Sequence, residues 1–269
     1  MVDQFDPSFT ENVIKATGPK TDPRMRQVMT ALIRHLHDFA REVELTVDEW
    51  MEGVNLINWA GQMSNDKRNE GQLVCDVLGL ESRREESLIQ RSLVDEITFS
   101  RAANAPDAAT ATAILGPFFR TDAPHYPNGS SIIKTPPADG EVTYMHGKVV
   151  DSATGEPIEG VVIDIWEAST NGMYEQQDPD QADCPAGKIL QLLDRHPMRP
   201  AHIHLIATHK DYKPITTQIF DSEDKYLADD SVFAVKHSLI VNFKALEGND
   251  KATREVEYDL KLKKQSTAN

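Results

Sequence analysis

Apolar residues recur at helical spacing over the first 80 residues of the chain. Asp22 followed by Pro23 is typical of a helix start, and the apolar positions after it lie three or four residues apart. They are Met25, Val28, Met29, Leu32, Ile33, Leu36, Phe39 and Ala40. The stretch TVDE at 46–49 is a capping box, which predicts a second helix, and a third helix is expected through QLVCDVLG at 72–79.

The periodic pattern ends at about residue 81. ESRREESLIQRS at 81–92 is charged and aperiodic, and ANAPDAATATA at 103–113 is rich in small residues and turn formers. We therefore predict a domain boundary in this part of the chain. Residues 1–105 form a helical domain that serves in dimerisation or as a linker, and residues 106–269 form a second domain.

After residue 112 the pattern changes to that of strands. Apolar and polar residues alternate, or β-branched and aromatic residues cluster, in short segments separated by turn residues. The segments are GEVTYMHGKVVD (140–151), VVIDIWEA (161–168), RPAHIHLIATH (199–209), PITTQIFD (214–221), HSLIVNFKAL (237–246) and REVEYDLKL (254–262). This spacing predicts a mainly β protein, in which a β-sandwich follows the N-terminal helices.

Composition and charge narrow the classes of function. The 269 residues are 39% hydrophobic, and the formal net charge of −15 argues against binding to nucleic acid or to an anionic membrane surface. Neither a signal peptide nor an apolar run long enough for membrane insertion is seen, so we expect a cytoplasmic protein. Two cysteines rule out a disulfide framework or a thiolate metal site. Helices at one end of a chain often pack on a second subunit, so we expect a homodimer formed through the N-terminal helices.

Two histidines in RPAHIHL at 199–205 are the first candidates for chemistry. On a strand His202 and His204 point to the same face, and Ile203 points to the other. They can converge on one metal ion, or they can be two cross-strand hydrogen-bonding imidazoles. His35 and His37 have the same spacing, but on a helix they point away from each other.

Four stretches carry a resemblance to a known family. LGPFFRTDAP (115–124), VDSATGEPIEGVVIDIWEASTNGMYEQQDP (150–179), RHPMRPAHIHL (195–205) and ITTQIFD (215–221) together resemble the intradiol ring-cleavage dioxygenases. Within that family the chain most resembles the hydroxyquinol 1,2-dioxygenases. The resemblance implies a ferric enzyme, Fe(3+) being its cofactor, that uses dioxygen to cleave hydroxyquinol or catechol between the two hydroxylated carbons. The product is of the muconate or maleylacetate type.

The resemblance also assigns roles to individual residues. Tyr174, His202 and His204 match iron ligands, Arg199 matches an arginine that stabilises negative charge on the substrate ring, and Gln218 matches an amide near the histidines. Substrate-pocket positions are matched by Leu73, Asp76, Ile114, Gly116, Pro117 and Arg199. The chemistry is consistent, because ferric iron favours anionic oxygen such as a phenolate and neutral imidazoles complete a site with an open position. Asp76 is placed to meet a third ring hydroxyl, which favours hydroxyquinol.

The chain departs from the family in two places. Between Tyr174 and His202 the family has roughly thirty more residues, including a second tyrosine ligand, and no tyrosine lies in that interval here. The twelve-residue charged segment at 81–92 looks like an insertion into a helical segment of the family. The two changes suggest a splice variant or a misread gene structure, and the chain as printed is expected to bind iron weakly and to be nearly inactive. A non-catalytic β-sandwich and a cupin-like ferrous enzyme remain alternatives.

Overall fold

The computed structural model describes residues 7–65, 68–80, 108–174 and 184–265. It divides into two compact units, Met1–Asn58 and Trp59–Asn269, each of which is described by itself. The predicted boundary between 105 and 106, the charged segment 81–92 and the junction after Tyr174 all fall outside the described residues. The two-domain division at 105 therefore stays a prediction. None of the described helices is long and apolar enough to cross a membrane.

The first unit contains α1 (Phe9–Lys15), α2 (Pro23–Glu42) and the start of α3 (Val47–Met63). Both predicted helix starts are confirmed. The Asp22 carboxylate accepts a hydrogen bond from the backbone N–H of Met25 at 3.0 Å. Thr46 and Glu49 form the reciprocal capping box, since each side chain accepts from the backbone N–H of the other.

The apolar stripe of α2 is exposed. α1 packs against the polar side of α2, where the His37 ring stacks on Phe9 and its Nδ1 lies 3.0 Å from the Thr10 hydroxyl. No residue of α2 is buried. Large apolar side chains with more than a third of their surface exposed follow one another along the helix: Met25, Val28, Met29, Leu32, Leu36 and Phe39.

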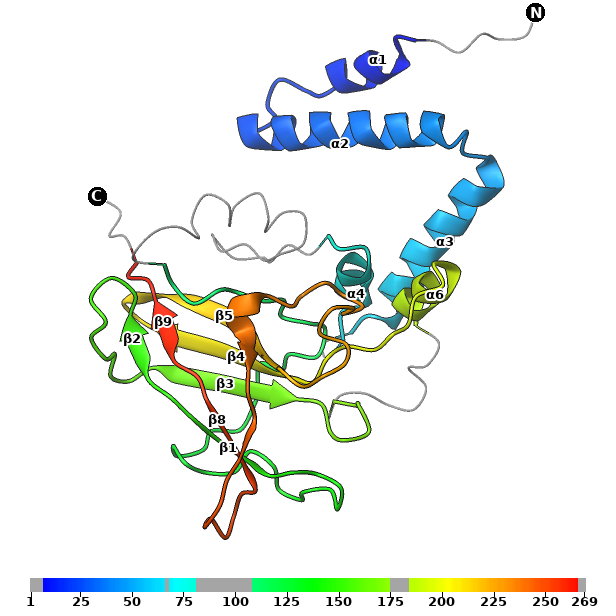
Figure 1. Ribbon diagram of the computed structural model, residues 1–269. Coiled ribbons are helices and arrows are strands. Elements are labelled where there is room, and N and C mark those ends of the chain that lie inside the picture. The colour runs from blue at the N-terminus through cyan, green and yellow to red at the C-terminus, as the bar shows by residue number, and fades with distance from the viewer. Residues whose placement is uncertain (1–6, 66–67, 81–107, 175–183, 266–269) are drawn as a thin grey trace, which may run out of the picture. The chain divides into compact units, whose positions relative to one another are not determined.

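The second unit is built on a four-stranded sheet with the order β3-β4-β5-β6. Figure 1 labels three of its strands, β3, β4 and β5. The strands are β3 (Val162–Glu167), β4 (His202–His209), β5 (Tyr212–Asp221) and β6 (Ile240–Val241). β3, β4 and β5 are antiparallel neighbours, and β6 runs parallel to β5. β4 and β5 form a hairpin, and most residues of both strands are buried.

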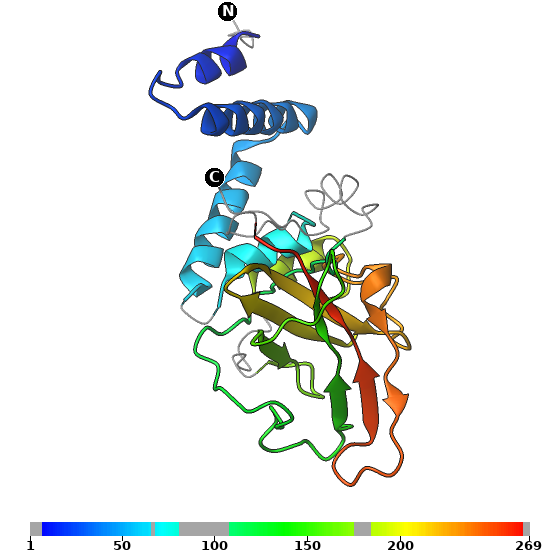
Figure 2. The ribbon, with the colours of Figure 1, turned by 90° about the vertical axis from the view of Figure 1, so that its left-hand side faces the viewer.

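Shorter strands form two further sheets. β1 (Thr143–His146), β8 (Arg254–Glu257) and β7 (Lys244–Ala245) make one, and β2 (Val149–Asp151) pairs with β9 (Leu260–Leu262) in the other. Figure 2 shows β2 and β9 side by side. Their apolar side chains pack against one face of the four-stranded sheet. One core cluster joins Ile203, Leu205 and Ile219 to Val256, and a second joins Ala207, Tyr212 and Ile215 to Leu260 and Leu262.

The described part of this unit also contains the end of α3 and two short helices. α4 (Glu70–Val77) packs against α6 (Pro185–Leu192), and a 3-10 turn (His237–Leu239) precedes β6. Cys184 caps α6, because its sulfur accepts from the backbone N–H of Gly187 at 3.2 Å. The predicted third helix is thus confirmed as α4, and it groups with the sheets.

The predicted fold class is confirmed only in its coarser form. An N-terminal helical region precedes a β-sheet domain, but the structure is mixed α and β and not mainly β. The reason is the length of the elements: α2 alone has 20 residues, whereas the longest strand, β5, has 10. Most strands facing the central sheet are two to four residues long, so the second layer is split between two small sheets and not one continuous sheet.

Candidate metal centre

Tyr174, His202 and His204 meet at the beginning of β4. The Tyr174 hydroxyl oxygen lies 3.0 Å from Nε2 of His202 and 3.0 Å from Nε2 of His204. Because Ile203 and Leu205 face the core between the sheets, the two histidines project from the opposite face of β4. The structure therefore brings together the three residues that the sequence proposed as ligands.

A tight turn after β3 delivers Tyr174 to the histidines. The backbone N–H of Gly172 donates to the Ser169 carbonyl at 2.8 Å, and that of Ser169 donates to the Met173 carbonyl at 2.8 Å. Gly172 has a φ of +80°, which a residue without a Cβ adopts readily. The Phe118 ring stacks on Tyr174 with centroids 5.0 Å apart. The turn thus positions the backbone of Tyr174, and Phe118 positions its ring.

His204 is enclosed by neighbours from three segments. The strand register places Trp166 of β3 and Gln218 of β5 directly opposite it. The Trp166 ring stacks on the imidazole with centroids 4.6 Å apart. The backbone of Gly116, where φ is +74°, lies close to the imidazole of His204. A Cβ at position 116 would be 3.3 Å from Cε1 of His204. A larger residue at 116 would thus meet the ring.

Burial keeps both imidazoles neutral. It is the main reason that the pKa of His202 falls to about 3 and that the pKa of His204 lies well below its usual value, and the nearby Arg199 charge acts in the same direction. Nδ1 of His202 donates to the Pro200 carbonyl at 2.6 Å in the neutral tautomer that leaves the Nε2 lone pair available. Burial also raises the pKa of Tyr174 to about 12, with Arg199 lowering it and Glu167 and Asp230 raising it.

The three donor atoms fit a first-row metal ion. Two ligands bound at about 2.0–2.1 Å and roughly at right angles are separated by about 3 Å, which matches the distances of 3.0 Å from the phenol oxygen to each Nε2. The described residues contain no cluster of three or more His, Cys, Asp or Glu side chains suited to a metal. The phenol oxygen is therefore what completes this donor set, and phenolate suits a hard, highly charged cation.

Arg199 lies directly beside the donor set. Its Nη1 is 2.9 Å from Nε2 of His202, and its Nη2 donates to the Gln218 side-chain oxygen at 2.9 Å. Gln218 in turn donates from Nε2 to the Ile114 carbonyl at 2.6 Å. These contacts link Arg199 and Gln218 to the 114–116 segment, in which Ile114 and Gly116 are buried, as expected if that segment is a wall of the site.

The predicted pocket residues Leu73 and Asp76 lie on α4. Asp76 is buried and Leu73 half-buried, while Pro117 is half-buried between Gly116 and Phe118. Arg195 connects α4 to the site region, because its guanidinium donates to the Val77 carbonyl at 2.8 Å and also to the Ser231 carbonyl.

Three residues at the site were missed by the sequence analysis. Asp230 pairs with Arg199, Trp166 stacks on His204, and Phe118 stacks on Tyr174. Trp166 could have been predicted from the sequence, because the antiparallel pairing of β3 with β4 places it opposite His204. No sequence signal pointed to Asp230, since the stretch ADDS at 228–231 is typical of an ordinary solvated turn.

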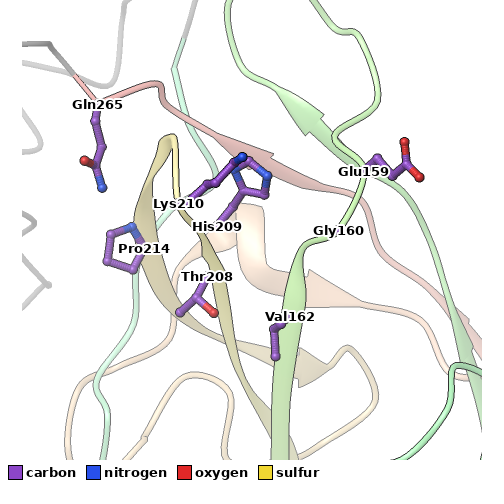
Figure 3. A pocket seen from close by; sticks show the side chains of 8 residues that line it. All are labelled: Glu159, Gly160, Val162, Thr208, His209, Lys210, Pro214 and Gln265. Carbon is purple, nitrogen blue, oxygen red and sulfur yellow. The ribbon is translucent and has the colours of Figure 1, made fainter.

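A hollow on this unit lies away from the candidate metal centre. Its volume is about 780 Å³. It is lined by Thr208, His209 and Lys210 at the tip of the β4–β5 hairpin and by Val162 of β3 (Figure 3). Val162 pairs with Thr208, whereas Trp166 pairs with His204 at the other end of the strands. Four residues of strand separate the two places by about 13 Å. The hollow is therefore distinct from the candidate metal centre.

Comparisons with known proteins identify the chain's relatives. The profile of the catechol dioxygenase N terminus matches residues 22–90, and the dioxygenase profile matches residues 114–186 and 179–264. The intradiol ring-cleavage dioxygenase prcA of Aspergillus niger is 46% identical, with 96% of this chain and 89% of that protein covered. Catechol 1,2-dioxygenase of Candida albicans is 38% identical, with 97% and 93% covered.

A solved structure agrees with these matches. Hydroxyquinol 1,2-dioxygenase from Pseudomonas putida DLL-E4 superposes with a TM-score of 0.75 at 31% identity, covering 95% of this chain and 97% of that one. Members of this family use non-haem ferric iron, to which the donor set of Tyr174, His202 and His204 is suited. These matches exclude the cupin-like alternative. The chain belongs to the intradiol ring-cleavage dioxygenases, which cleave catechol-type aromatic diols.

Proposed function

We propose that this chain uses Tyr174, His202 and His204 to hold the ferric ion at which an aromatic vicinal diol is cleaved by dioxygen. The observation that carries this proposal is the position of the phenol oxygen, 3.0 Å from both imidazole nitrogens in a buried setting. Ferric iron, when bound, would accept electron density from the diol and make a ring carbon reactive toward dioxygen. Cleavage between the hydroxylated carbons gives a muconate or maleylacetate-type product.

The surrounding residues bind and orient the substrate. Arg199 is permanently charged and planar, so it is suited to stabilising negative charge on the diol oxygens. Its Nη1 already lies against a proposed ligand, which places the guanidinium at the edge of the donor set. The 114–117 segment supplies an apolar wall, and the stacked rings of Phe118 and Trp166 limit the access of water to Tyr174 and His204.

Hydroxyquinol is the proposed substrate, with catechol as the alternative. Asp76 is 1% exposed, and α4 is tied through Arg195 to the loop that holds Arg199. A buried carboxylate that meets the third ring hydroxyl would discriminate against a diol that lacks it, because the polar group would then lose its partner. One relative carries the name catechol 1,2-dioxygenase and another hydroxyquinol 1,2-dioxygenase, so the comparison of the two substrates is informative.

The Asp76→Ala variant tests this choice. Oxygen uptake with hydroxyquinol and with catechol is measured on the chain with a typical family segment restored between Asp183 and Pro185, because the chain without it is expected to be nearly inactive. The restored protein that keeps Asp76 is expected to prefer hydroxyquinol, and the ratio of kcat/KM values should fall by about tenfold to a hundredfold in the variant. Asp250→Ala, at an exposed loop position, serves as the control. Equal or better cleavage of catechol by the restored protein that keeps Asp76, or an unaltered ratio in Asp76→Ala, would contradict the assignment.

A second proposal is that this form of the chain is impaired, because it lacks the second tyrosine. Two observations support a missing segment. The dioxygenase profile matches in two pieces that overlap at 179–186, and the alignment with prcA spans 289 positions, more than the 269 residues of this chain. Sequencing of the transcript decides the origin of the gap: reads that encode both junctions would eliminate a misread gene structure.

We also propose that two copies associate through the exposed stripe of α2. The apolar residues are spaced as a continuous helical seam, and a like seam on a second copy would cover them. Sedimentation velocity is expected to show a dimer, and Leu32→Glu should raise its dissociation constant by at least about tenfold through loss of a buried leucine. His35→Glu, at an exposed polar position on α2, is the control. A monomer at high micromolar concentration would refute this proposal.

A further inference from the structure

Asp230 forms a two-point ion pair with the guanidinium of Arg199, on the side away from His202. Nε of Arg199 donates to Oδ1 of Asp230 at 2.9 Å, and Nη2 donates to Oδ2 at 3.2 Å. The side chain of Asp230 is 2% exposed and that of Arg199 is 18% exposed, so the pair is largely removed from water. Such a paired, planar contact defines the direction of the guanidinium as well as its position.

The carboxylate of Asp230 is itself fixed by the backbone. Oδ1 accepts from the N–H of Val232 at 3.3 Å, and Oδ2 accepts from the N–H of Ala234 at 3.0 Å. Burial opposes ionisation, but the charge and hydrogen bonds of Arg199 hold the pKa of Asp230 below its usual value. The carboxylate is therefore a charged group with a defined orientation, and both of its oxygens already serve two donors each.

The loop around Asp230 is also held by Arg195, which lies outside the donor set. Arg195 donates to the Ser231 carbonyl and lies over the Phe233 ring, 4.7 Å from its centroid. Phe233 has a φ of +58°, an uncommon conformation for a bulky residue, which marks this turn as determined by its surroundings. Asp230 is thus held independently of Arg199, as a residue must be if it is to orient its partner.

We propose that Asp230 is a positioning residue for ring cleavage, which sets the plane of the Arg199 guanidinium so that Nη1 faces the metal-side edge of His202. Nε and one N–H of Nη2 are taken by Asp230, and Gln218 accepts from Nη2 as well. What remains directed at the donor set is Nη1, 2.9 Å from Nε2 of His202. Asp230 acts through Arg199 and does not itself contact the donor set in these interactions. The inference rests on the proposed function of Arg199.

A first experiment needs neither iron nor substrate. In ¹⁵N-arginine-labelled protein the Arg199 Nε–H signal, assigned by its loss in Arg199→Lys, is expected to exchange with solvent at least about tenfold more slowly than that of an exposed arginine. Asp230→Asn should remove this protection. Asp229→Asn should retain it, because Asp229 is the neighbouring exposed carboxylate and pairs with His196. Fast exchange in the unchanged protein would overturn the proposal, whether or not Asp230→Asn folds.

A second experiment separates positioning from a merely structural role. Affinity for 4-nitrocatechol, a coloured diol, is measured without oxygen on iron-reconstituted protein in a double-mutant cycle. Asp230→Asn should weaken binding by about tenfold to a hundredfold, whereas adding the same change to Arg199→Ala should have little further effect. Asp230→Glu, which keeps the charge, should recover part of the affinity. Equal losses in the two backgrounds would overturn the proposal.

The two experiments distinguish this inference from the proposed function. Failure to bind ferric iron at Tyr174, His202 and His204, even with the family segment and its tyrosine restored, would contradict the proposed function and leave the slow exchange of Arg199 unaffected. Iron binding together with fast exchange of Arg199, or with additive losses in the cycle, would contradict only the role of Asp230. Melting temperatures of each variant, measured alongside, show which losses come from unfolding.

Discussion

Restoring a typical family segment between Asp183 and Pro185 is expected to convert this chain from a weak iron binder to one that holds about one ferric ion per chain. The reason is charge. In the family two tyrosinates and hydroxide balance the charge of the ferric ion, whereas here Tyr174 is the sole protein anion proposed as a ligand. An additional fixed anionic ligand favours ferric over ferrous iron and also supplies a base that takes up a substrate proton. Diol turnover should rise by more than about a hundredfold.

The restored segment has an internal control. A second version carries the same segment with phenylalanine in place of its tyrosine, so that the added strands are present and the ligand is absent. We expect bound iron, visible colour and turnover to be restored only with the tyrosine, and solubility to improve in both versions because sheet edges are covered. Comparable iron content and turnover in the printed chain and the restored one would show that the second tyrosine is dispensable.

The His204→Ala variant is expected to lose metal binding almost completely. Partners that merely hydrogen-bond to a metal ligand contribute about tenfold to a hundredfold in affinity, so removal of a ligand should cost more. Because Trp166 stacks on His204 at 4.6 Å, quenching of its fluorescence gives a direct titration of metal at this site. Loss of the quenching in Trp166→Phe, with metal content retained, confirms the source of the signal.

His209→Ala is the matched control for this variant. It lies on the same strand, β4, but packs against Tyr212 at the other end, so it is expected to leave metal affinity unchanged. His204→Gln preserves more of the buried volume and tests whether a cavity, and not the lost ligand, lowers affinity. Metal binding by a folded His204→Ala protein with unchanged affinity would remove His204 from the proposed ligand set.

The candidate site was more predictable than the shape of the domain around it. His202 and His204 were placed on one face of a strand from their spacing alone, and the structure puts them there, with Ile203 in the core on the other side. Tyr174, Arg199 and Gln218 were found through the family resemblance, because they lie far apart in sequence and no local pattern connects them. Their mutual distances became visible only with the strands paired.

The sequence by itself determined the local elements: the helix starts at Asp22 and Thr46, the strands that became β3, β4 and β5, and the shared face of the two histidines. These depend on periodicity and on contacts within a few residues. Tertiary structure alone decided that Asp230 grips Arg199, that Gly116 passes against His204, and that the α2 stripe is exposed. Each of these depends on segments distant in the chain, whose approach is set by the packing of whole sheets and by long-range contacts that no local window of residues contains.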